Sequence, residues 1–163
     1  FLLAYSLMEY LIRCKGRILI TSSASHKKMK MRWRDIMFKH GYNPLLAYKQ
    51  SKLANMLFVY GLNDRFANRG VSAFGIDPGL VKTDIGFKNT SEIVKIIWKL
   101  RHKKGVSAGI PAKIYLFLLN QADSPKGLYY DMSGKAAFSR QVNRENADRL
   151  WALSGQLCGV NWG

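Results

Sequence analysis

The stretch GRILITSSAS, residues 16–25, decides the fold expected of this chain. It is short and rich in β-branched residues, and it ends in small hydroxyl side chains. That pattern is typical of a buried parallel strand whose carboxyl end opens into a loop. A second such strand is predicted at Val71–Ile76, just before Asp77, Pro78 and Gly79. Both strands should end at one edge of a sheet, where α/β proteins have their active sites.

Helices are predicted between and around these strands, because apolar residues recur there every three or four positions. The segments concerned are 1–17, 45–70, 89–105, 106–121 and 143–159. Gly70 is expected to end the second helix, and a short strand is expected within SPKGLYYDMSG, residues 124–134. The alternation of strands and helices predicts an α/β fold with a parallel sheet.

Apolar stripes along three of these helices are expected to mark their packing faces. They are Leu3, Leu7, Tyr10 and Leu11 in the first helix, Leu53, Met56, Leu57, Tyr60 and Leu62 in the second, and Leu150, Leu153 and Leu157 in the last.

The number of predicted strands bears on the domain organisation. A sheet of about three strands is thin for this fold, since parallel strands need neighbours and helices on both faces. We therefore interpret residues 1–163 as a single partial domain, the C-terminal half of a doubly wound parallel-sheet (Rossmann) domain. No G-x-G-x-x-G motif follows a strand, so the cofactor-binding half is expected before Phe1. We interpret the opening segment as a helix that the start of the chain interrupts, and not as a signal peptide.

The composition is that of a folded, basic protein. Of the 163 residues, 48% are hydrophobic, and 26 Lys and Arg against 10 Asp and Glu give a net charge of +16. The positive charge is concentrated in residues 26–40 and 99–105. We interpret both segments as solvated loop faces, with contact to an anionic membrane surface as the alternative. A nucleic-acid-binding module is not expected, because no aromatic-rich strand, helix-turn-helix or zinc spacing is present.

Cysteine usage indicates the compartment. Cys14 and Cys158 lie far apart and have no metal-type neighbours, so they predict neither a disulfide framework nor a metal site. This favours a reducing, intracellular setting. No run of about 18 or more uncharged apolar residues occurs, so no transmembrane helix is expected.

The segment AYKQSKLAN, residues 47–55, carries the clearest candidate chemistry. Tyr48 and Lys52 are four residues apart on a predicted helix, so their side chains rise from the same face. A phenol is a weak acid near neutrality, but a neighbouring ammonium favours its ionised form and lowers its pKa. The pair could therefore provide a proton donor and acceptor tuned toward pH 7. A surface tyrosine beside a solvated lysine is the alternative. Ser22 and Ser23 end the first strand and can polarise a carbonyl oxygen or simply shape a turn.

Three motifs in order, ILITSSASH, AYKQSKLAN and DPGLVKT, resemble those of the short-chain dehydrogenase/reductase family. The likeness is greatest to its retinol dehydrogenase-like branch, which includes the WW-domain oxidoreductase and has the patterns RIVNVSSxAH, AYxxSKLAN and HPGxVxT. It covers essentially all 163 residues, including the closing NADRLWALSGQLCG. Two departures stand out: Asp77 occupies the position of the branch's histidine, and the loop after Ser25 is more basic.

The resemblance implies NAD(P)-dependent interconversion of an alcohol and a carbonyl, with NADP as the cofactor and NAD as the alternative. It makes Tyr48 the catalytic acid/base and Lys52 the residue that activates it and binds the nicotinamide ribose. Ser23, rather than Ser22, would position the substrate oxygen. The remaining residues implied to line the nicotinamide pocket are Pro78, Gly79, Val81 and Thr83.

The resemblance also implies the partners. The substrate would be a small lipophilic alcohol or carbonyl compound, such as a retinoid, a steroid or a lipid aldehyde, covered by residues 84–105. Peripheral contact with the endoplasmic reticulum or mitochondrial membrane is implied, with a cytoplasmic location as the alternative, and so is a homodimer. The family's glycine-rich turn and catalytic asparagine would precede Phe1. A truncated, inactive member that acts only by interaction is the alternative to an enzyme.

Overall fold

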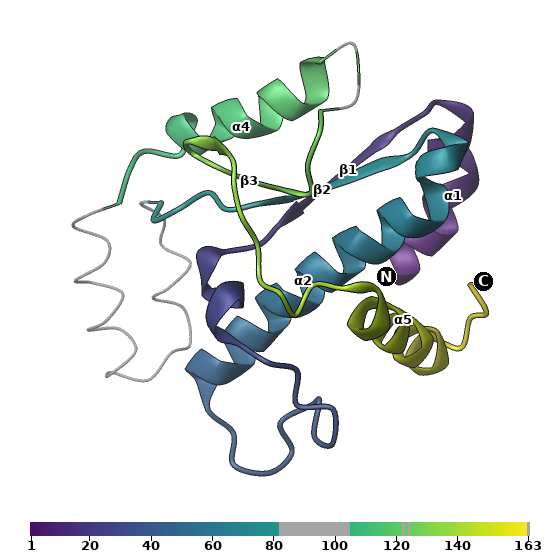
Figure 1. Cartoon of the computed structure of the whole chain (residues 1–163), viewed down its shortest axis with the longest axis vertical. Coiled ribbons are helices and arrows are strands. Elements are labelled where there is room, and N and C mark those ends of the chain that lie inside the picture. Colours follow the sequence, from purple (N-terminus) through teal and green to yellow (C-terminus); the bar gives the residue numbers. More distant parts are fainter. Residues whose placement is uncertain (82–104, 122, 124, 163) are drawn as a thin grey trace.

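The computed structural model describes residues 1–81, 105–121, 123 and 125–162 (Figure 1). Apart from Gly105, the helix predicted at residues 89–105 and the expected substrate cover lie outside the described residues, as does Thr83. Within them, the chain forms an α/β structure around one sheet.

The sheet has four strands in the order β1-β2-β3-β4. They are β1 (Arg17–Thr21), β2 (Ser72–Ile76), β3 (Tyr129–Asp131) and β4 (Gly134–Lys135). The first three run parallel, with Ile18 opposite Ala73 and Gly75 opposite Tyr129. This confirms the predicted parallel sheet. The antiparallel β4 was not predicted, because a strand of two residues shows no periodicity.

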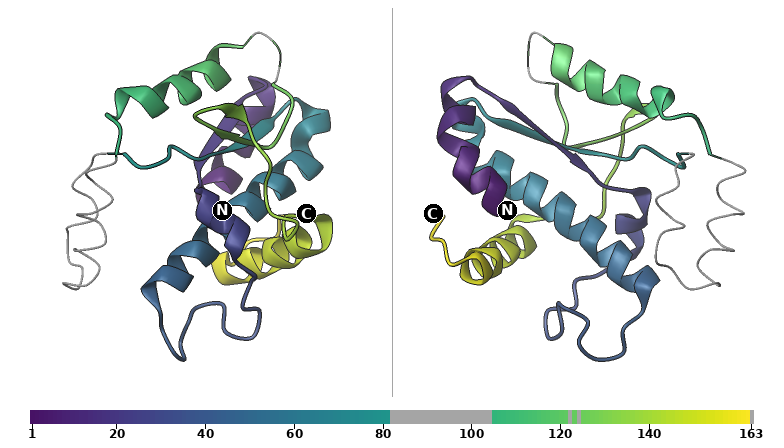
Figure 2. Two further views of the ribbon diagram at one scale, coloured as in Figure 1. Left: turned by 60° about the vertical axis from the view of Figure 1, so that its left-hand side comes forward. Right: turned by 180° about the vertical axis from the view of Figure 1, so that it is seen from behind.

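Helices cover both faces of the sheet, as expected of a doubly wound fold (Figures 1 and 2). On one face lie α1 (Leu2–Arg13) and α2 (Pro44–Phe66), and on the other lies α4 (Gly109–Asn120). The last helix, α5 (Arg144–Cys158), packs on the side of α2 that faces away from the sheet. Two short 3₁₀ helices, η1 (Ala24–Lys28) and η2 (Ala67–Arg69), follow β1 and α2.

Strand β2 shows how the sequence distributes side chains between the two helical layers. Ala73 belongs to the core shared with α1 and α2, whereas Phe74 and Ile76 pack with Leu118 of α4. Successive side chains of a strand point to opposite faces, which accounts for this division. At Gly75 a Cβ atom would lie 2.2 Å from the sulfur of Met56, so glycine permits the close approach of α2.

The long helix α2 positions the candidate chemistry and is stabilised at both ends. The Asn43 side chain caps it by accepting hydrogen bonds from the backbone N–H groups of Leu45 and Leu46, both at 3.0 Å. Gly70 adopts φ 85°, which favours glycine, where the helical segment and η2 end. Four of the five predicted stripe residues are buried, and Tyr60 is half-buried.

Two predicted packing faces were only partly right: Leu11 of α1 and Leu150 of α5 pack against the core, but other members of both stripes are exposed. In α5 the buried residues are Ala147, Trp151 and Gly155, while Leu157 is 68% exposed. The large indole of Trp151 determines the contact, because it reaches α2 and lies under the Arg65 guanidinium at 4.4 Å. In α1, Met8 is buried against the sheet, whereas Leu3, Leu7 and Tyr10 are exposed.

Candidate active site

The carboxyl end of β1 presents two serines with different environments. The Ser22 side chain is buried, and its hydroxyl donates to the backbone oxygen of Lys52 at 3.0 Å. Ser23 is half-buried and precedes η1, and its hydroxyl oxygen accepts a hydrogen bond from the Ser25 backbone N–H at 3.3 Å. Ser22 therefore ties β1 to α2, while the hydroxyl proton of Ser23 remains available for donation.

The first turns of α2 bring Tyr48 and Lys52 to the same edge. The Lys52 ammonium donates to the backbone oxygen of Thr21 at 3.3 Å, and Asn55 donates to the same oxygen at 2.9 Å. The Lys52 nitrogen lies 5.5 Å from the centre of the Tyr48 ring, within cation–π range. Burial lowers the pKa of Lys52, and the negative charge of Asp77 opposes this.

Asp77 accepts hydrogen bonds from three different segments at the carboxyl edge of the sheet. One carboxylate oxygen accepts from the Ala24 backbone N–H at 2.7 Å and from the Tyr129 hydroxyl at 3.1 Å. The other accepts from the Gly79 backbone N–H at 2.9 Å. Burial, and secondly the nearby Asp77 charge, raise the pKa of the Tyr129 hydroxyl, so Tyr129 remains a donor. The sequence indicated Asp77 only as a departure from the family pattern.

His26 is the second residue that sequence reasoning missed. It is fully buried, and its Nε2 accepts a hydrogen bond from the Ser139 backbone N–H at 3.2 Å. The proton therefore resides on Nδ1, which donates to the backbone oxygen of Ser23 at 2.6 Å. Burial is the main reason that the pKa of His26 is lowered. The only sequence signal for His26 was its position three residues after Ser23. We interpreted the basic segment that contains it as a solvated loop, so its burial was not predicted.

A cavity of about 520 Å³ opens where these segments meet. It brings together Ser23, Tyr48, Gly79 and Val81 among the predicted site residues. Lys52 lies beside the Tyr48 ring, and Pro78 precedes Gly79 in the same loop but is not part of the cavity lining. The remaining residues of the lining are Ala24, Ser25, Lys28, Lys49, Asp77 and Leu80.

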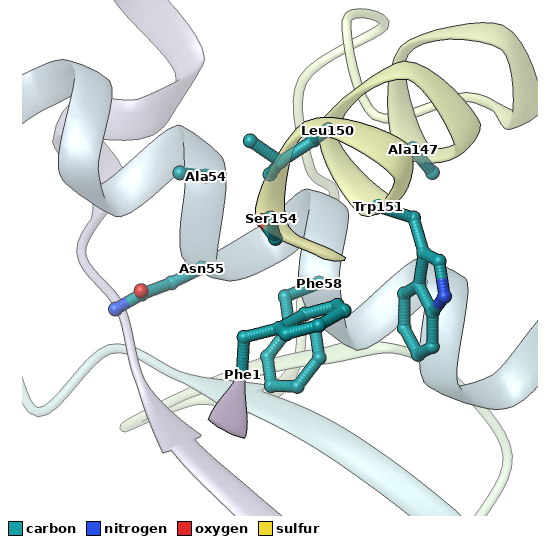
Figure 3. A pocket seen from close by; sticks show the side chains of 8 residues that line it. All are labelled: Phe1, Ala54, Asn55, Phe58, Ala147, Leu150, Trp151 and Ser154. Atoms are coloured by element: carbon teal, nitrogen blue, oxygen red, sulfur yellow. The ribbon is translucent and has the colours of Figure 1, made fainter. Parts of the chain in front are cut away.

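A second cavity, of about 170 Å³, lies between α2 and α5 and near Phe1 (Figure 3). Its lining is mostly apolar and includes Phe58 and Trp151, whose rings are 5.7 Å apart. No acidic or basic side chain lines it, so it offers no group for proton transfer. Of these two cavities, the one beside Ser23 and Tyr48 is therefore the candidate active site.

Comparisons with known proteins agree with this architecture. No protein-family model matches the chain. Retinol dehydrogenase 12 of Mus musculus is 32% identical over 166 residues, which cover 99% of this chain and 52% of the relative. Polyprenol dehydrogenase of Homo sapiens is 30% identical, over 89% of this chain and 46% of the relative. The crystal structure of a short-chain dehydrogenase from Streptomyces avermitilis matches with a TM-score of 0.53 at 14% identity, over 96% of this chain and 54% of that one.

Together with the α/β sheet and its carboxyl-edge cavity, these relatives show that the chain belongs to the short-chain dehydrogenase/reductase family. Its relatives within the family include retinol and polyprenol dehydrogenases, which are oxidoreductases. The chain spans about half the length of the curated relatives it matches. The prediction of part of a Rossmann-type domain is thereby confirmed. Among the described helices, none has the length and apolar character needed to cross a bilayer.

Proposed function

We propose that the protein containing this chain is an NAD(P)-dependent oxidoreductase that interconverts an alcohol and a carbonyl. Residues 1–163 would form one part of its catalytic domain, which carries the groups that handle the proton. The observation that carries the proposal is that Ser23 and Tyr48 line one cavity at the carboxyl edge of the sheet, with the Lys52 ammonium beside the Tyr48 ring.

Ser23 and Tyr48 would together hold the substrate oxygen. The Ser23 hydroxyl accepts from Ser25 and donates to no acceptor in the described part of the chain, so its proton can point toward a carbonyl oxygen in the cavity. The Tyr48 hydroxyl would donate a second hydrogen bond and then transfer its proton as charge develops on that oxygen. In alcohol oxidation the Tyr48 phenolate would accept the alcohol proton instead.

Lys52 would stabilise the ionised form of Tyr48 in both directions. Its position is constrained, since its ammonium is anchored on the Thr21 carbonyl at the end of β1. The Asp77 carboxylate favours the charged form of Lys52 and so opposes the effect of burial. A cation held beside a phenol lowers the free energy of the phenolate relative to the phenol.

The residues present also fit a nicotinamide cofactor. Leu80 and Val81 give the cavity an apolar wall for the ring, and the Lys52 ammonium is a donor suited to the ribose hydroxyls. Pro78, Gly79, Val81 and Thr83 would hold the nicotinamide, which when bound exchanges a hydride with the substrate carbon. We favour NADP, with NAD as the alternative.

The substrate would be a small lipophilic alcohol or carbonyl compound, since the relatives include retinol and polyprenol dehydrogenases. The test is to compare the full-length protein with its Tyr48→Phe variant, following NADPH and NADH consumption with lipophilic aldehydes and ketones. We expect turnover to fall by at least about 100-fold, the lower range for loss of a general acid. Tyr42→Phe, which removes an exposed hydroxyl outside the cavity, is the matched control and should retain turnover.

Unchanged turnover in Tyr48→Phe would refute the catalytic assignment. If the full-length protein neither binds a nicotinamide cofactor nor turns over any of these compounds, the protein is instead an inactive family member that acts by interaction.

A further inference from the structure

Two lysines line the candidate active-site cavity in addition to the groups that would handle the proton. Lys28, at the end of η1, and Lys49, in the first turns of α2, share this lining with Ser23 and Tyr48. The proposed chemistry uses neither of them. A neutral retinoid or aldehyde would also gain nothing from two ammonium groups.

Neither lysine is neutralised within the described ranges. The ion pairs found there join arginines to carboxylates at other places, and no hydrogen bond or ion pair engages the side chain of Lys28 or Lys49. The cavity does contain one carboxylate, that of Asp77, but it offsets only one of the two ammonium charges, and its oxygens already accept hydrogen bonds from Ala24, Gly79 and Tyr129. The cavity therefore has positive charge to offer to a ligand.

The positive surface continues away from the cavity. Lys28 also lines a neighbouring groove of about 580 Å³, together with Lys27, Lys30 and Arg140. A continuous basic surface that leads to a cavity attracts anions and raises their rate of association.

We propose that the substrate of this site carries an anionic group, a carboxylate or a phosphate, which Lys28 and Lys49 bind while Ser23 and Tyr48 hold the reacting oxygen. The inference rests on the proposed function and adds a substrate class to it: an amphiphilic alcohol or aldehyde with a negatively charged end. A cavity of about 520 Å³ can hold such a molecule.

The cofactor also carries phosphates, which are a second source of anionic groups for Lys28 and Lys49. Lys49 adjoins Tyr48 on α2, and Lys28 lies on η1, which begins directly after Ser23. Both lysines thus come from the elements that would hold the substrate oxygen. Apart from Lys52 of α2, which would bind the ribose, the residues proposed to hold the cofactor come from the loop after β2. This placement favours the substrate as the source.

The experiment compares two aldehydes that differ only in charge: an ω-oxo fatty acid and its methyl ester. The full-length protein is assayed with NADPH and NADH, and the ratio of kcat/KM for the acid to that for the ester is determined. We expect the wild type to prefer the acid, and Lys28→Gln/Lys49→Gln to lower the ratio about tenfold, as two partly exposed charge contacts allow. Lys113→Gln, which removes the same charge from an exposed position on α4, should keep the ratio.

Measuring the affinity of the full-length Tyr48→Phe variant for both aldehydes tests the anion site independently of turnover, and so independently of the proposed function. Tighter binding of the acid, lost in the double lysine variant, supports the anion site even if no turnover is found. Equal binding of acid and ester overturns it. It is also overturned if the double variant raises the KM for NADPH and leaves the acid-to-ester ratio unchanged, because the lysines would then serve the cofactor.

Discussion

Replacing Asp77 with asparagine tests whether this carboxylate holds the candidate active site together. The carboxylate accepts three hydrogen bonds, two on one oxygen and one on the other. An asparagine side chain has a single oxygen, so its amide nitrogen must face at least one of these donors. Its best orientation keeps the bonds from Ala24 and Tyr129 and sets the amide nitrogen against the Gly79 N–H.

Loss of one hydrogen bond to a charged acceptor costs about 1.5–3 kcal/mol, so Asp77→Asn should lower the free energy of unfolding by that amount. The measurement is urea unfolding of the full-length protein. Asp123→Asn, which removes an exposed charge, should stay within about 0.5 kcal/mol of the wild type. A double-mutant cycle with Tyr129→Phe should give a coupling of at least about 0.5 kcal/mol, because the Tyr129 hydroxyl bonds a charged acceptor in the wild type and a neutral one in Asp77→Asn.

The same substitution should change the pH dependence of the reaction. Asp77 raises the pKa of Lys52 against the effect of burial, so a neutral asparagine leaves that pKa lower. The high-pH limb of the kcat profile should then move to lower pH. Zero coupling with Tyr129, together with an unmoved high-pH limb, would refute the role assigned to Asp77.

Two further predictions concern residues near the end of β1. Ser23→Ala should lower kcat at least about tenfold with little effect on the free energy of unfolding. Ser22→Ala should instead lower the free energy of unfolding by about 1 kcal/mol, because the buried Ser22 hydroxyl loses its bond to α2. Equal losses of activity in both variants would contradict the choice of Ser23 as the substrate-binding serine. Because burial lowers the pKa of His26 in the folded protein, the unfolded chain takes up the proton first as the pH falls through about 6.5, and stability is lost on acidification. Tm values measured between pH 7.5 and 5.5 should therefore fall less in His26→Gln than in the wild type, and an equal fall would show that His26 does not contribute.

The strands and the long helix could be predicted because their signals are local. The run that became β1, the stop at Gly70 and the stripe containing Leu53 and Met56 each depend on residues close together in the chain. Periodicity shows which residues share a face but not which face finds a neighbour. For that reason the exposure of Leu3 and Leu157 was not foreseen.

The supports of the candidate site could not be predicted from spacing. Asp77 meets Ala24 and Tyr129 across separations of 53 and 52 residues, and His26 meets Ser139 across 113. Such contacts depend on the order of strands in the sheet, which brings distant loops to one edge. The motif residues themselves come from neighbouring elements, so their proximity follows from the parallel pairing of β1 and β2.

The position of β1 at one end of the described strand order has a practical consequence. None of its five residues is buried, and among the described strands only β2 pairs with it. The unpaired backbone groups along such a strand are a template for strand addition. When the 163-residue chain is produced by itself, the open side of β1 and the exposed apolar residues of α1 should lead copies to associate edge to edge. A lysine at Ile18 or Ile20 would lower the stability of the fold, because both side chains pack on the core. A charged residue at Leu3, whose side chain is exposed, should reduce association without that loss.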